Sequence, residues 1–207
     1  MIIIVNYDAG NVGSVLNICR KAGGLAKISS DPATIASATK LILPGVGHFG
    51  RAMQRLEQSG LVAALHEAVM VRRVPILGIC LGMQLFSSHS DEGDAAGLGW
   101  IAAHTVRFSF DAPSPLKIPH MGWNTMDPRR STPLFDRLPE APRFYFVHSY
   151  HVVCDDEADI LATTMHGIPF ASAIGHANIW GTQFHPEKSH KYGVAVMRNF
   201  VDRVDAC

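Results

Sequence analysis

The sequence predicts an α/β fold with a central, mostly parallel sheet flanked by helices and with antiparallel strands added in the C-terminal half. Short apolar runs alternate with helical patterns in the first half of the chain, an order typical of a parallel sheet covered by helices. Strand-like segments joined by short loops dominate the second half, as in antiparallel hairpins. Apolar residues make up 47% of the 207 residues, which is enough for a buried core.

Elements of the first half follow from apolar spacing and from residues that begin or end a helix. Continuous apolar runs predict buried strands, and apolar residues at helical spacing predict amphipathic helices. Asp31 and Pro32 are a typical N-cap and first helical residue, and Gly23 and Gly24 stop the preceding helix. The expected strands are residues 2–6, 25–28, 41–43 and 74–79, and the expected helices are residues 14–22, 61–71, 81–86 and one that starts at Pro32.

The second half is expected to contain strands, one long loop and a final helix. Residues 109–142 contain seven prolines and little periodicity, so this stretch is expected to be mostly loop. Because neither repeats nor a linker interrupt the chain, residues 1–207 are expected to form one domain. The expected strands are residues 100–108, 143–147, 160–164, 170–174 and 179–184, followed by a helix over residues 192–204.

Charge and composition exclude several classes of protein. Lys+Arg and Asp+Glu are 18 each, and this zero net charge argues against a nucleic-acid partner. No window approaches the roughly 18 apolar residues of a membrane span. The apolar start lacks a basic leader, so residues 2–6 are interpreted as a strand and not as a signal peptide. Four scattered cysteines without an export signal favour a reducing cytoplasm.

Histidines are numerous, 11 in all, but their spacing does not indicate a metal site. His148 and His151 are three apart in a strand-like stretch and should point to opposite faces. Neither an H-E-x-x-H nor a C-x-x-C motif is present. We therefore expect neither a metal nor a cofactor, and we expect most of these histidines to be surface or packing residues.

Residues 78–82 (GICLG) follow a predicted strand and open a predicted helix. This is the pattern of a nucleophile elbow, in which a tight turn lifts a reactive side chain, here Cys80, out of the sheet. The flanking glycines permit the strained turn, while the helix N-terminus favours the thiolate and supplies the Leu81 N–H to a developing oxyanion. The alternative is a small buried cysteine at a glycine-rich strand end.

His185 and Glu187 are candidates for the base and for the group that orients it, which a cysteine nucleophile needs. In an extended chain, residues two apart share a face, and Pro186 holds His185 near extended geometry. The two side chains can therefore point into one cleft, where Glu187 would hold the imidazole tautomer. The alternative is an exposed strand end with an incidental His and Glu.

Residues 44–47 (PGVG) follow the third predicted strand and offer an oxyanion site. Glycines on either side of Val46 would let a peptide plane reorient so that the Val46 N–H faces a tetrahedral oxygen. We expect Val46, Gly47 and Leu81 to hold the oxyanion, with the reorientation as a switch that a partner or acceptor controls. Taken alone, an ordinary Pro-Gly turn is the simpler interpretation.

Residues 78–84 (GICLGMQ) resemble the nucleophile segment of class I (triad) glutamine amidotransferases, and residues 44–47 resemble the oxyanion loop of that family. Cys80, His185 and Glu187 also follow one another in the order that the family uses. The resemblance implies a flavodoxin-like amidotransferase fold in which the cysteine attacks the side-chain amide of glutamine. It also implies that Gln84 helps to hold this substrate.

Four further stretches resemble the glutaminase subunits of imidazole glycerol phosphate synthase, and with the elbow and the oxyanion loop they run through nearly the whole chain. This resemblance implies a glutamine pocket lined by His148, Ser149 and Tyr150, chiefly through backbone groups around Ser149. The four stretches are residues 6–11 (NYDAGN), 119–124 (PHMGWN), 144–150 (FYFVHSY) and 184–189 (FHPEKS).

The same resemblance implies a heterodimer of histidine biosynthesis, in which a (β/α)₈ cyclase subunit receives ammonia through an internal tunnel. Asn11, Trp123 and Lys188 correspond to positions near the interface with that subunit. Residue type alone leaves Trp123 equally open as a core residue and Lys188 as a solvated charge. No synthetase domain accompanies the glutaminase segments, so the acceptor chemistry is expected on a separate polypeptide.

Three alternatives remain open. Residues 7–13 (YDAGNVG), 150–154 (YHVVC) and 188–193 (KSHKYG) lean toward a paralogous amidotransferase subunit that supplies ammonia for amidination of a surface (lipopolysaccharide) sugar. A non-enzymatic flavodoxin-like binding module is a weaker alternative, because residues 10–13 do not complete a G-x-G-x-x-G motif. A stand-alone cysteine hydrolase or peptidase would turn over substrate without a partner and would not need the pocket of Gln84 and Ser149.

Overall fold

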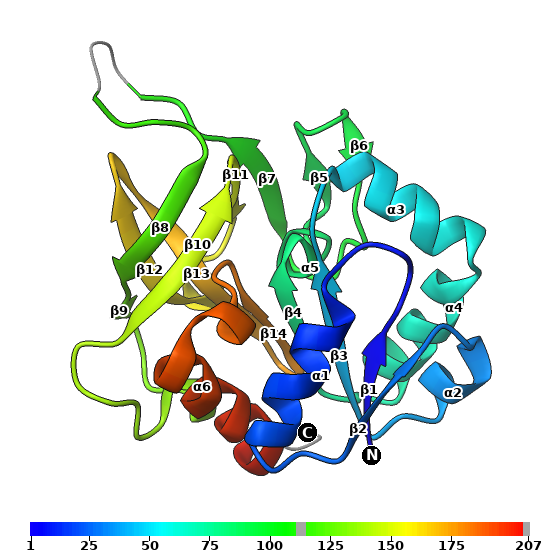
Figure 1. Ribbon diagram of the computed structural model, residues 1–207. Coiled ribbons are helices and arrows are strands. Elements are labelled where there is room, and N and C mark those ends of the chain that lie inside the picture. Colours follow the sequence, from blue (N-terminus) through cyan, green and yellow to red (C-terminus); the bar gives the residue numbers. More distant parts are fainter. Residues whose placement is uncertain (111–114, 205–207) are drawn as a thin grey trace.

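The computed structural model describes residues 1–110 and 115–204, and a large sheet runs through its centre (Figure 1). The strands are β1 (Ile2–Val5), β2 (Ala26–Ser29), β3 (Lys40–Gly45), β4 (Ile76–Cys80), β5 (His89–Ser90), β6 (Ala95–Ala96), β7 (Ala103–Arg107), β8 (His120–Thr125), β9 (Asp127–Pro128), β10 (Arg143–His148), β11 (Tyr150–Cys154), β12 (Ile160–His166), β13 (Ile168–His176) and β14 (Ile179–Thr182). The helices are α1 (Val12–Lys21), α2 (Pro32–Ala36), α3 (Phe49–Gln58), α4 (Leu61–His66), the π-helix η1 (Glu67–Val71), α5 (Leu81–Gln84) and α6 (His190–Arg203), with 3₁₀ turns η2 (Pro133–Phe135), η3 (Glu157–Asp159) and η4 (Pro186–Lys188).

The first half of the chain forms the predicted parallel sheet together with β14, a strand of the second half that was expected only in antiparallel pairing. β2, β1, β3, β4 and β14 lie side by side in this order, and every neighbouring pair is parallel. The register pairs Gly45 of β3 with Cys80 of β4, and Thr182 of β14 with Ile79. The carboxyl ends of these three strands therefore meet at one edge of the sheet, where open α/β sheets hold their sites.

The second half adds antiparallel strands, as predicted. β13 pairs antiparallel with β14, β12 and β11, and β11 pairs in the same way with β7. β8 and β10 form a separate antiparallel ribbon that lies next to β12 (Figure 1). The predicted fold class, a mostly parallel α/β sheet extended by antiparallel strands, is thus confirmed.

Helices cover both faces of the parallel sheet and produce two hydrophobic cores. The alternating side chains of β1 show this division, because successive residues of a strand point to opposite faces. Ile3 and Val5 belong to the core that includes Phe49 of α3. Ile2 and Ile4 belong to the other core, which α1 and α6 cover on the near side of the sheet in Figure 1.

The helices follow the predictions with adjusted ends. Asp31 caps α2 by accepting a hydrogen bond from Thr34 N at 2.8 Å, as expected of an N-cap. The helix expected over residues 61–71 divides into α4 and η1, and the last helix is α6. Among the helices of the described residues, none is long and apolar enough to cross a membrane.

Helix α3 has no counterpart among the expected elements. Its buried side chains are Phe49, Ala52, Met53 and Leu56, while the rest of the helix is polar, charged or small. These four positions follow helical spacing, so the sequence did carry a pattern from which α3 could have been predicted.

The described part of residues 109–142 is mostly loop as expected, but it also contains β8, a strand that was not predicted. This strand pairs with β10 from Thr125 opposite Arg143 to His120 opposite His148. Gly122 within it has φ 128°, and the strand lacks a β-branched run, so the pairing with β10 and not local preference makes the strand. Residues 111–114 of this stretch lie outside the described residues.

Candidate active site

Cys80 ends β4 in a strained backbone conformation and leads directly into α5. Its φ of 55° and ψ of −110° lie in a region that non-glycine residues adopt only where the surroundings enforce it. Gly82 has to be a glycine, because a Cβ there would lie 1.8 Å from the Leu43 carbonyl oxygen. This is the geometry of the predicted elbow, although α5 ends at Gln84 and not at Phe86.

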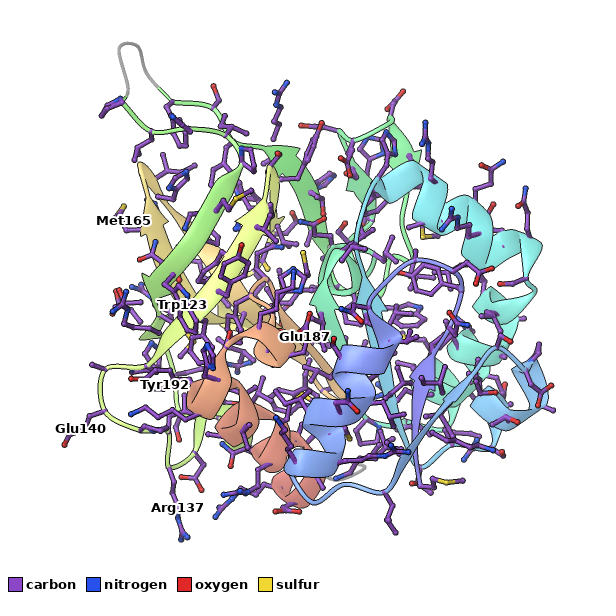
Figure 2. The ribbon with its side chains drawn as sticks, viewed as in Figure 1. Trp123, Arg137, Glu140, Met165, Glu187 and Tyr192 are labelled. Carbon is purple, nitrogen blue, oxygen red and sulfur yellow. The ribbon has the colours of Figure 1, made fainter. Side chains whose placement is uncertain are left out.

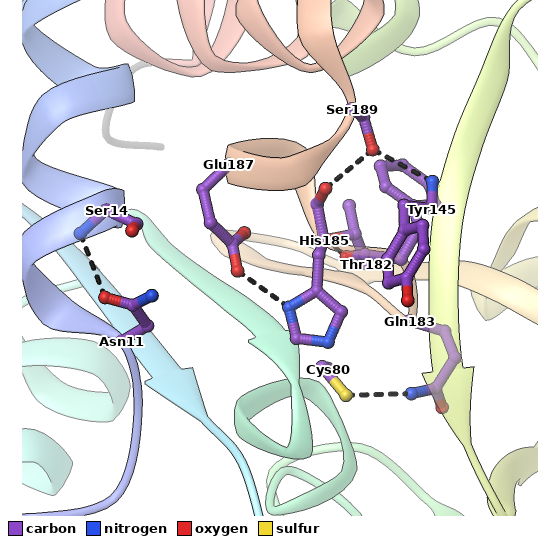
Figure 3. Close-up of polar contacts among 10 residues, drawn as sticks. Asn11, Ser14, Cys80, Tyr145, Thr182, Gln183, His185, Glu187 and Ser189 are labelled. Atoms are coloured by element: carbon purple, nitrogen blue, oxygen red, sulfur yellow. Dashed lines mark hydrogen bonds and ion pairs between the residues drawn. The ribbon is translucent and has the colours of Figure 1, made fainter. Parts of the chain in front are cut away.

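His185 and Glu187 are in direct contact in the interior. His185 Nδ1 lies 2.7 Å from Glu187 Oε1, and the two side chains are 2% and 3% exposed. An extended chain was expected to bring the two side chains together. This is wrong for the residues after His185, because Pro186–Lys188 forms the 3₁₀ turn η4. His185 itself is extended, as Pro186 requires, and the turn returns the carboxylate to the ring. In Figure 3 the ring lies between Glu187 and Cys80.

The His185 imidazole is stabilised in its protonated form. Burial by itself lowers its pKa, but the neighbouring Cys80 and then Glu187 outweigh burial and raise the pKa to about 10. Nδ1 donates to Glu187, so Nε2 is the nitrogen left for chemistry. Nε2 is buried and makes no hydrogen bond within the described residues, which leaves it available for proton transfer.

A cavity of about 540 Å³ opens at Cys80. This volume suits a small molecule such as an amino acid. Almost all predicted site residues line it, with Glu187 behind His185 and Trp123 as the exceptions. The lining residues are Asn11, Val46, Gly47, Cys80, Leu81, Gln84, Glu92, Pro119, Val147, His148, Ser149, Tyr150, His185 and Lys188.

Val46, Gly47 and Leu81, the expected oxyanion residues, share this cavity with Cys80. Leu81 is the first residue of α5, so its N–H has no partner within the helix. Gly47 has φ 102°, a conformation that favours glycine. Val46 is 46% exposed, so packing of its side chain does not hold the loop in one conformation.

Gln84 lines the cavity, but both of its amide hydrogens are used inside the protein. Its Nε2 donates to the Tyr150 carbonyl oxygen and to Gln183 Oε1, each at 3.0 Å. The amide oxygen Oε1 is the polar atom that remains for a ligand. Gln84 can therefore offer a substrate an acceptor but not a donor.

The expectation that His148 and His151 point to opposite faces is wrong. β10 ends at His148 and β11 begins at Tyr150, so Ser149 interrupts the alternation of a continuous strand. Both rings contact Phe108, with centroid distances of 5.3 and 4.6 Å. His148 Nδ1 also lies 2.7 Å from the Tyr150 carbonyl oxygen, so its ring is engaged in an internal contact at the cavity wall.

A chain of hydrogen bonds continues from His148 away from the cavity. His120 Nδ1 lies 3.1 Å from His148 Nε2, and Asn124 Nδ2 lies 3.2 Å from His120 Nε2. Burial lowers the pKa of both rings and keeps them neutral. His148 Nδ1 then donates to the Tyr150 carbonyl oxygen, which can only accept, and His148 Nε2 accepts from His120 Nδ1. Across the described residues, no three His, Cys, Asp or Glu side chains are grouped so that they could hold a metal ion.

The three expected interface residues lie in two places. Asn11 and Lys188 line the cavity, and Asn11 also caps α1 by accepting a hydrogen bond from Ser14 N at 3.2 Å. Trp123 lies on β8 (Figure 2) and not in a loop as expected, and it does not line the cavity. It is 39% exposed and stacks on His190 with ring centroids 5.4 Å apart, so it does not complete a core.

Two residues of the site were not predicted. Gln183 follows β14, and its Nε2 lies 3.6 Å from Cys80 Sγ. Only the pairing of β14 with β4 reveals this contact, and the sequence did not show that pairing. Glu92 lines the cavity and accepts a hydrogen bond from Phe49 N at 2.7 Å, from a loop without a recognisable motif.

The other cysteines of the described residues, Cys19 and Cys154, lie outside the site. Burial raises the pKa of the Cys19 thiol to about 11. Burial, followed by the charges of nearby aspartates, raises that of Cys154 to about 12. Neither lines the cavity, so both are poor nucleophiles outside the site. Cys207 lies outside the described residues.

Known proteins match this chain over nearly its whole length. The family model of class I glutamine amidotransferases matches residues 10–204. The chain is 50% identical over 201 residues to imidazole glycerol phosphate synthase subunit HisH 2 of Methanococcus maripaludis, covering 97% of this chain and 98% of that protein. It is 47% identical over 204 residues to the subunit of the same name from Pseudomonas aeruginosa, covering 99% and 100%.

Solved structures share the fold at low sequence identity. The structure of PurLQS from Thermotoga maritima superimposes with a TM-score of 0.73 at 15% identity, covering 97% of each chain. A crystal structure of a glutamine amidotransferase gives a TM-score of 0.67 at 16% identity, covering 94% of this chain and 98% of that one. With the full-length relatives and the matching family model, the chain belongs to the class I glutamine amidotransferases and, within them, to the family of HisH subunits.

Proposed function

We propose that this protein is the glutaminase subunit of an imidazole glycerol phosphate synthase, which hydrolyses glutamine to glutamate and ammonia for histidine biosynthesis. The observation that carries the proposal is the arrangement of Cys80 and the His185–Glu187 pair at one cavity of amino-acid size. The names of relatives that are 50% and 47% identical over nearly the whole chain support the assignment to this synthase.

The reaction begins when the Cys80 thiolate attacks the side-chain carbonyl carbon of glutamine and forms a C–S bond. The N–H groups of Val46 and Leu81 hold the oxyanion, and Gly47 gives the loop the conformation that this requires. His185 transfers the Nε2 proton to the amide nitrogen, the C–N bond breaks and ammonia leaves. A pKa of about 10 supports His185 as the proton donor at neutral pH.

The second half of the reaction regenerates the thiolate. His185, now neutral, takes a proton from a water molecule, and the resulting hydroxide attacks the γ-glutamyl thioester. The C–S bond breaks, the product leaves as the γ-carboxylic acid and loses its proton to water to give glutamate, and His185 is again protonated beside the Cys80 thiolate. Glu187 accepts the hydrogen bond from His185 Nδ1 throughout, which fixes the ring and stabilises its charge.

Polar groups along the cavity support glutamine as the substrate. Glu92 uses one carboxylate oxygen for Phe49 N and keeps the other for the α-ammonium group. Gln84 Oε1 accepts from a substrate N–H, and the backbone around Ser149 completes the pocket beside His148 and Tyr150. No metal, cofactor or nucleic acid takes part in this scheme.

We also propose that the chain is a single glutaminase domain that acts in the cytoplasm as a heterodimer with a (β/α)₈ cyclase subunit. The names of the relatives, which are subunits of a synthase, support a partner. Asn11 and Lys188 at the cavity and the exposed Met121 and Trp123 on β8 are the proposed contacts, because interfaces concentrate their energy on aromatic and apolar anchors.

Replacement of the nucleophile tests the glutaminase. Cys80→Ala should abolish release of ammonia from glutamine, while the complex with the cyclase subunit should still use added ammonium at the wild-type rate. The measurement is product formation with each nitrogen source. Glutaminase activity that survives in Cys80→Ala would overturn the mechanism.

Stimulation by the partner tests the pathway. The chain is mixed with a cyclase subunit of imidazole glycerol phosphate synthase, and glutamate release is followed with and without the ribosyl substrate or a product analogue. We expect release to rise when both are present, because the oxyanion loop is expected to respond to the partner. Absence of stimulation would contradict the assignment and favour the paralogous subunit for sugar amidination.

A further inference from the structure

The Cys80 sulfur has a second polar neighbour besides His185. Gln183 Nε2 lies 3.6 Å from Cys80 Sγ, and the residue is 0% exposed. The register that pairs Thr182 of β14 with Ile79 of β4 places the next residues of both strands, Gln183 and Cys80, side by side. The sheet therefore sets this contact, which Figure 3 shows on the side of the sulfur away from α1.

The hydrogen bonds around Gln183 determine which end of its amide faces the sulfur. The Tyr150 carbonyl oxygen can only accept, so the Gln84 atom at 3.0 Å from it is the amide nitrogen. That nitrogen gives its second hydrogen to Gln183 Oε1, also at 3.0 Å. The opposite end of the Gln183 amide, next to Cys80, is therefore the NH₂ group.

We propose that Gln183 is a further catalytic residue, which donates an N–H to the Cys80 thiolate and holds the sulfur in position for attack. A donor that faces sulfur stabilises the anion more than the neutral thiol. Gln84 acts as the positioning residue, because it fixes the amide from the Tyr150 carbonyl at the wall of the glutamine pocket. No proton is transferred in this role, and its catalytic consequence rests on the proposed glutaminase function.

A purely structural role makes a different prediction. If Gln183 only filled space and satisfied Gln84, its replacement would lower stability without changing the ionisation of Cys80. If it donates to the thiolate, its replacement moves the pH dependence of Cys80 reactivity to higher pH. Gln183 does not line the cavity, so kcat should fall while KM for glutamine stays near its wild-type value.

The experiment measures the rate of Cys80 alkylation by iodoacetamide against pH, with the Cys80 peptide quantified by mass spectrometry. Gln183→Met removes the donor at similar volume, and Gln183→Glu keeps an acceptor for Gln84 but sets a carboxyl oxygen against the sulfur. The midpoint of the curve of alkylation rate against pH should rise by roughly one pH unit in Gln183→Met and by more in Gln183→Glu. The free energy that a hydrogen bond contributes to a charged group corresponds to about one pH unit. Gln54→Met, at an exposed position of α3, is the matched control and should leave the midpoint unchanged.

Midpoints equal to wild type in both Gln183 variants would overturn the inference. If Gln183→Met does not fold, Gln183→Leu decides, because it also removes the donor and adds no charge beside Cys80. Failure of the proposed function is recognised separately. In that case glutamine would not protect wild-type Cys80 from alkylation at any pH, whatever the Gln183 variants do.

Discussion

His148 and His120 are buried bases that the fold keeps neutral. Burial is the main cause of their lowered pKa values, about 3 for His148 and about 4 for His120. A proton added to His148 Nε2 would also face the N–H that His120 donates to it. In the unfolded chain both rings bind protons near pH 6.5. The stability that they contribute is therefore complete above about pH 6.5 and is lost as pH falls toward the folded pKa values.

His148→Gln should reduce this dependence on acid. As the pH is lowered from about 6.5 to about 4, the free energy of unfolding should decrease more steeply for the wild type than for the variant. The difference in slope should approach one proton, about 1.4 kcal/mol per pH unit. Urea unfolding at a series of pH values measures both slopes, and His66→Gln at an exposed position is the control. Equal slopes in wild type and His148→Gln would contradict the assignment.

At the residue scale, short motifs predicted the chemistry but not the network around it. Cys80, His185 and Glu187 could be found because each belongs to a local pattern whose chemistry is recognisable. Gln183 could not, because its contact with Cys80 depends on which strand lies next to β4. Glu92 could not, because a loop of no particular pattern brings it to the cavity.

At the scale of elements, the elbow between β4 and α5 depends on the close approach of β3. Gly82 lies against the Leu43 carbonyl, and Gly78 lies against Phe86, where a Cβ would come within 2.6 Å of the ring. The strained conformation of Cys80 is therefore held by packing on both sides of the turn. A larger side chain at either glycine has to displace the elbow from the sheet.

Gly82→Ala tests this dependence. The added Cβ cannot be relieved by a flexible neighbour, because the atom that it meets belongs to the β3 backbone. We expect a loss of about 3 kcal/mol or more in the free energy of unfolding and loss of glutaminase activity. Gly13→Ala in α1 is the matched control, since a Cβ there meets nothing within 4 Å, and it should be neutral or stabilising by up to about 1 kcal/mol. Thermal unfolding and glutamate release measure both variants, and a stable, active Gly82→Ala enzyme would refute the account of the elbow.

Sequence patterns predicted the elements of the parallel sheet better than those of the antiparallel part. Buried strands such as β1 and β4 are continuous apolar runs bounded by turns, so local composition identifies them. β8 carries His, Gly, Trp and Asn, and only its pairing with β10 makes it a strand. The predicted alternation of side chains across residues 148–151 was wrong for a similar reason. Tertiary pairing ends β10 at His148 and begins β11 at Tyr150, so these residues do not form one continuous strand.

At the scale of the whole molecule, the proposed contacts with a partner are residues of the cavity and exposed apolar side chains of β8. Met121 is 62% exposed and Trp123 39%, although both are large and apolar. Asn11 and Lys188 line the cavity where α1 and η4 lie next to each other. In the proposed heterodimer, a partner bound at these residues would cover the cavity and receive ammonia from it without release to water.

Trp123→Ala should weaken the complex with the cyclase subunit. Loss of an aromatic anchor at an interface typically costs about 2 kcal/mol or more, so Kd should rise roughly 30-fold. Isothermal titration calorimetry with the cyclase subunit measures the change. Val71→Ala provides the control, because Val71 is 61% exposed but precedes β4 at the opposite end of the strand from Cys80. An unchanged Kd for Trp123→Ala would place the partner elsewhere.

In the proposed mechanism, Cys80 attacks the side-chain amide of glutamine and His185 transfers the protons. Labelling with a diazo-ketone analogue of glutamine, followed by peptide mass spectrometry, tests it most directly. We expect the label to appear on Cys80 alone, glutamine to protect Cys80 from labelling, and His185→Ala to slow labelling strongly. Labelling of Cys19 or Cys154 at the same rate, or labelling of Cys80 that glutamine does not prevent, would contradict this mechanism.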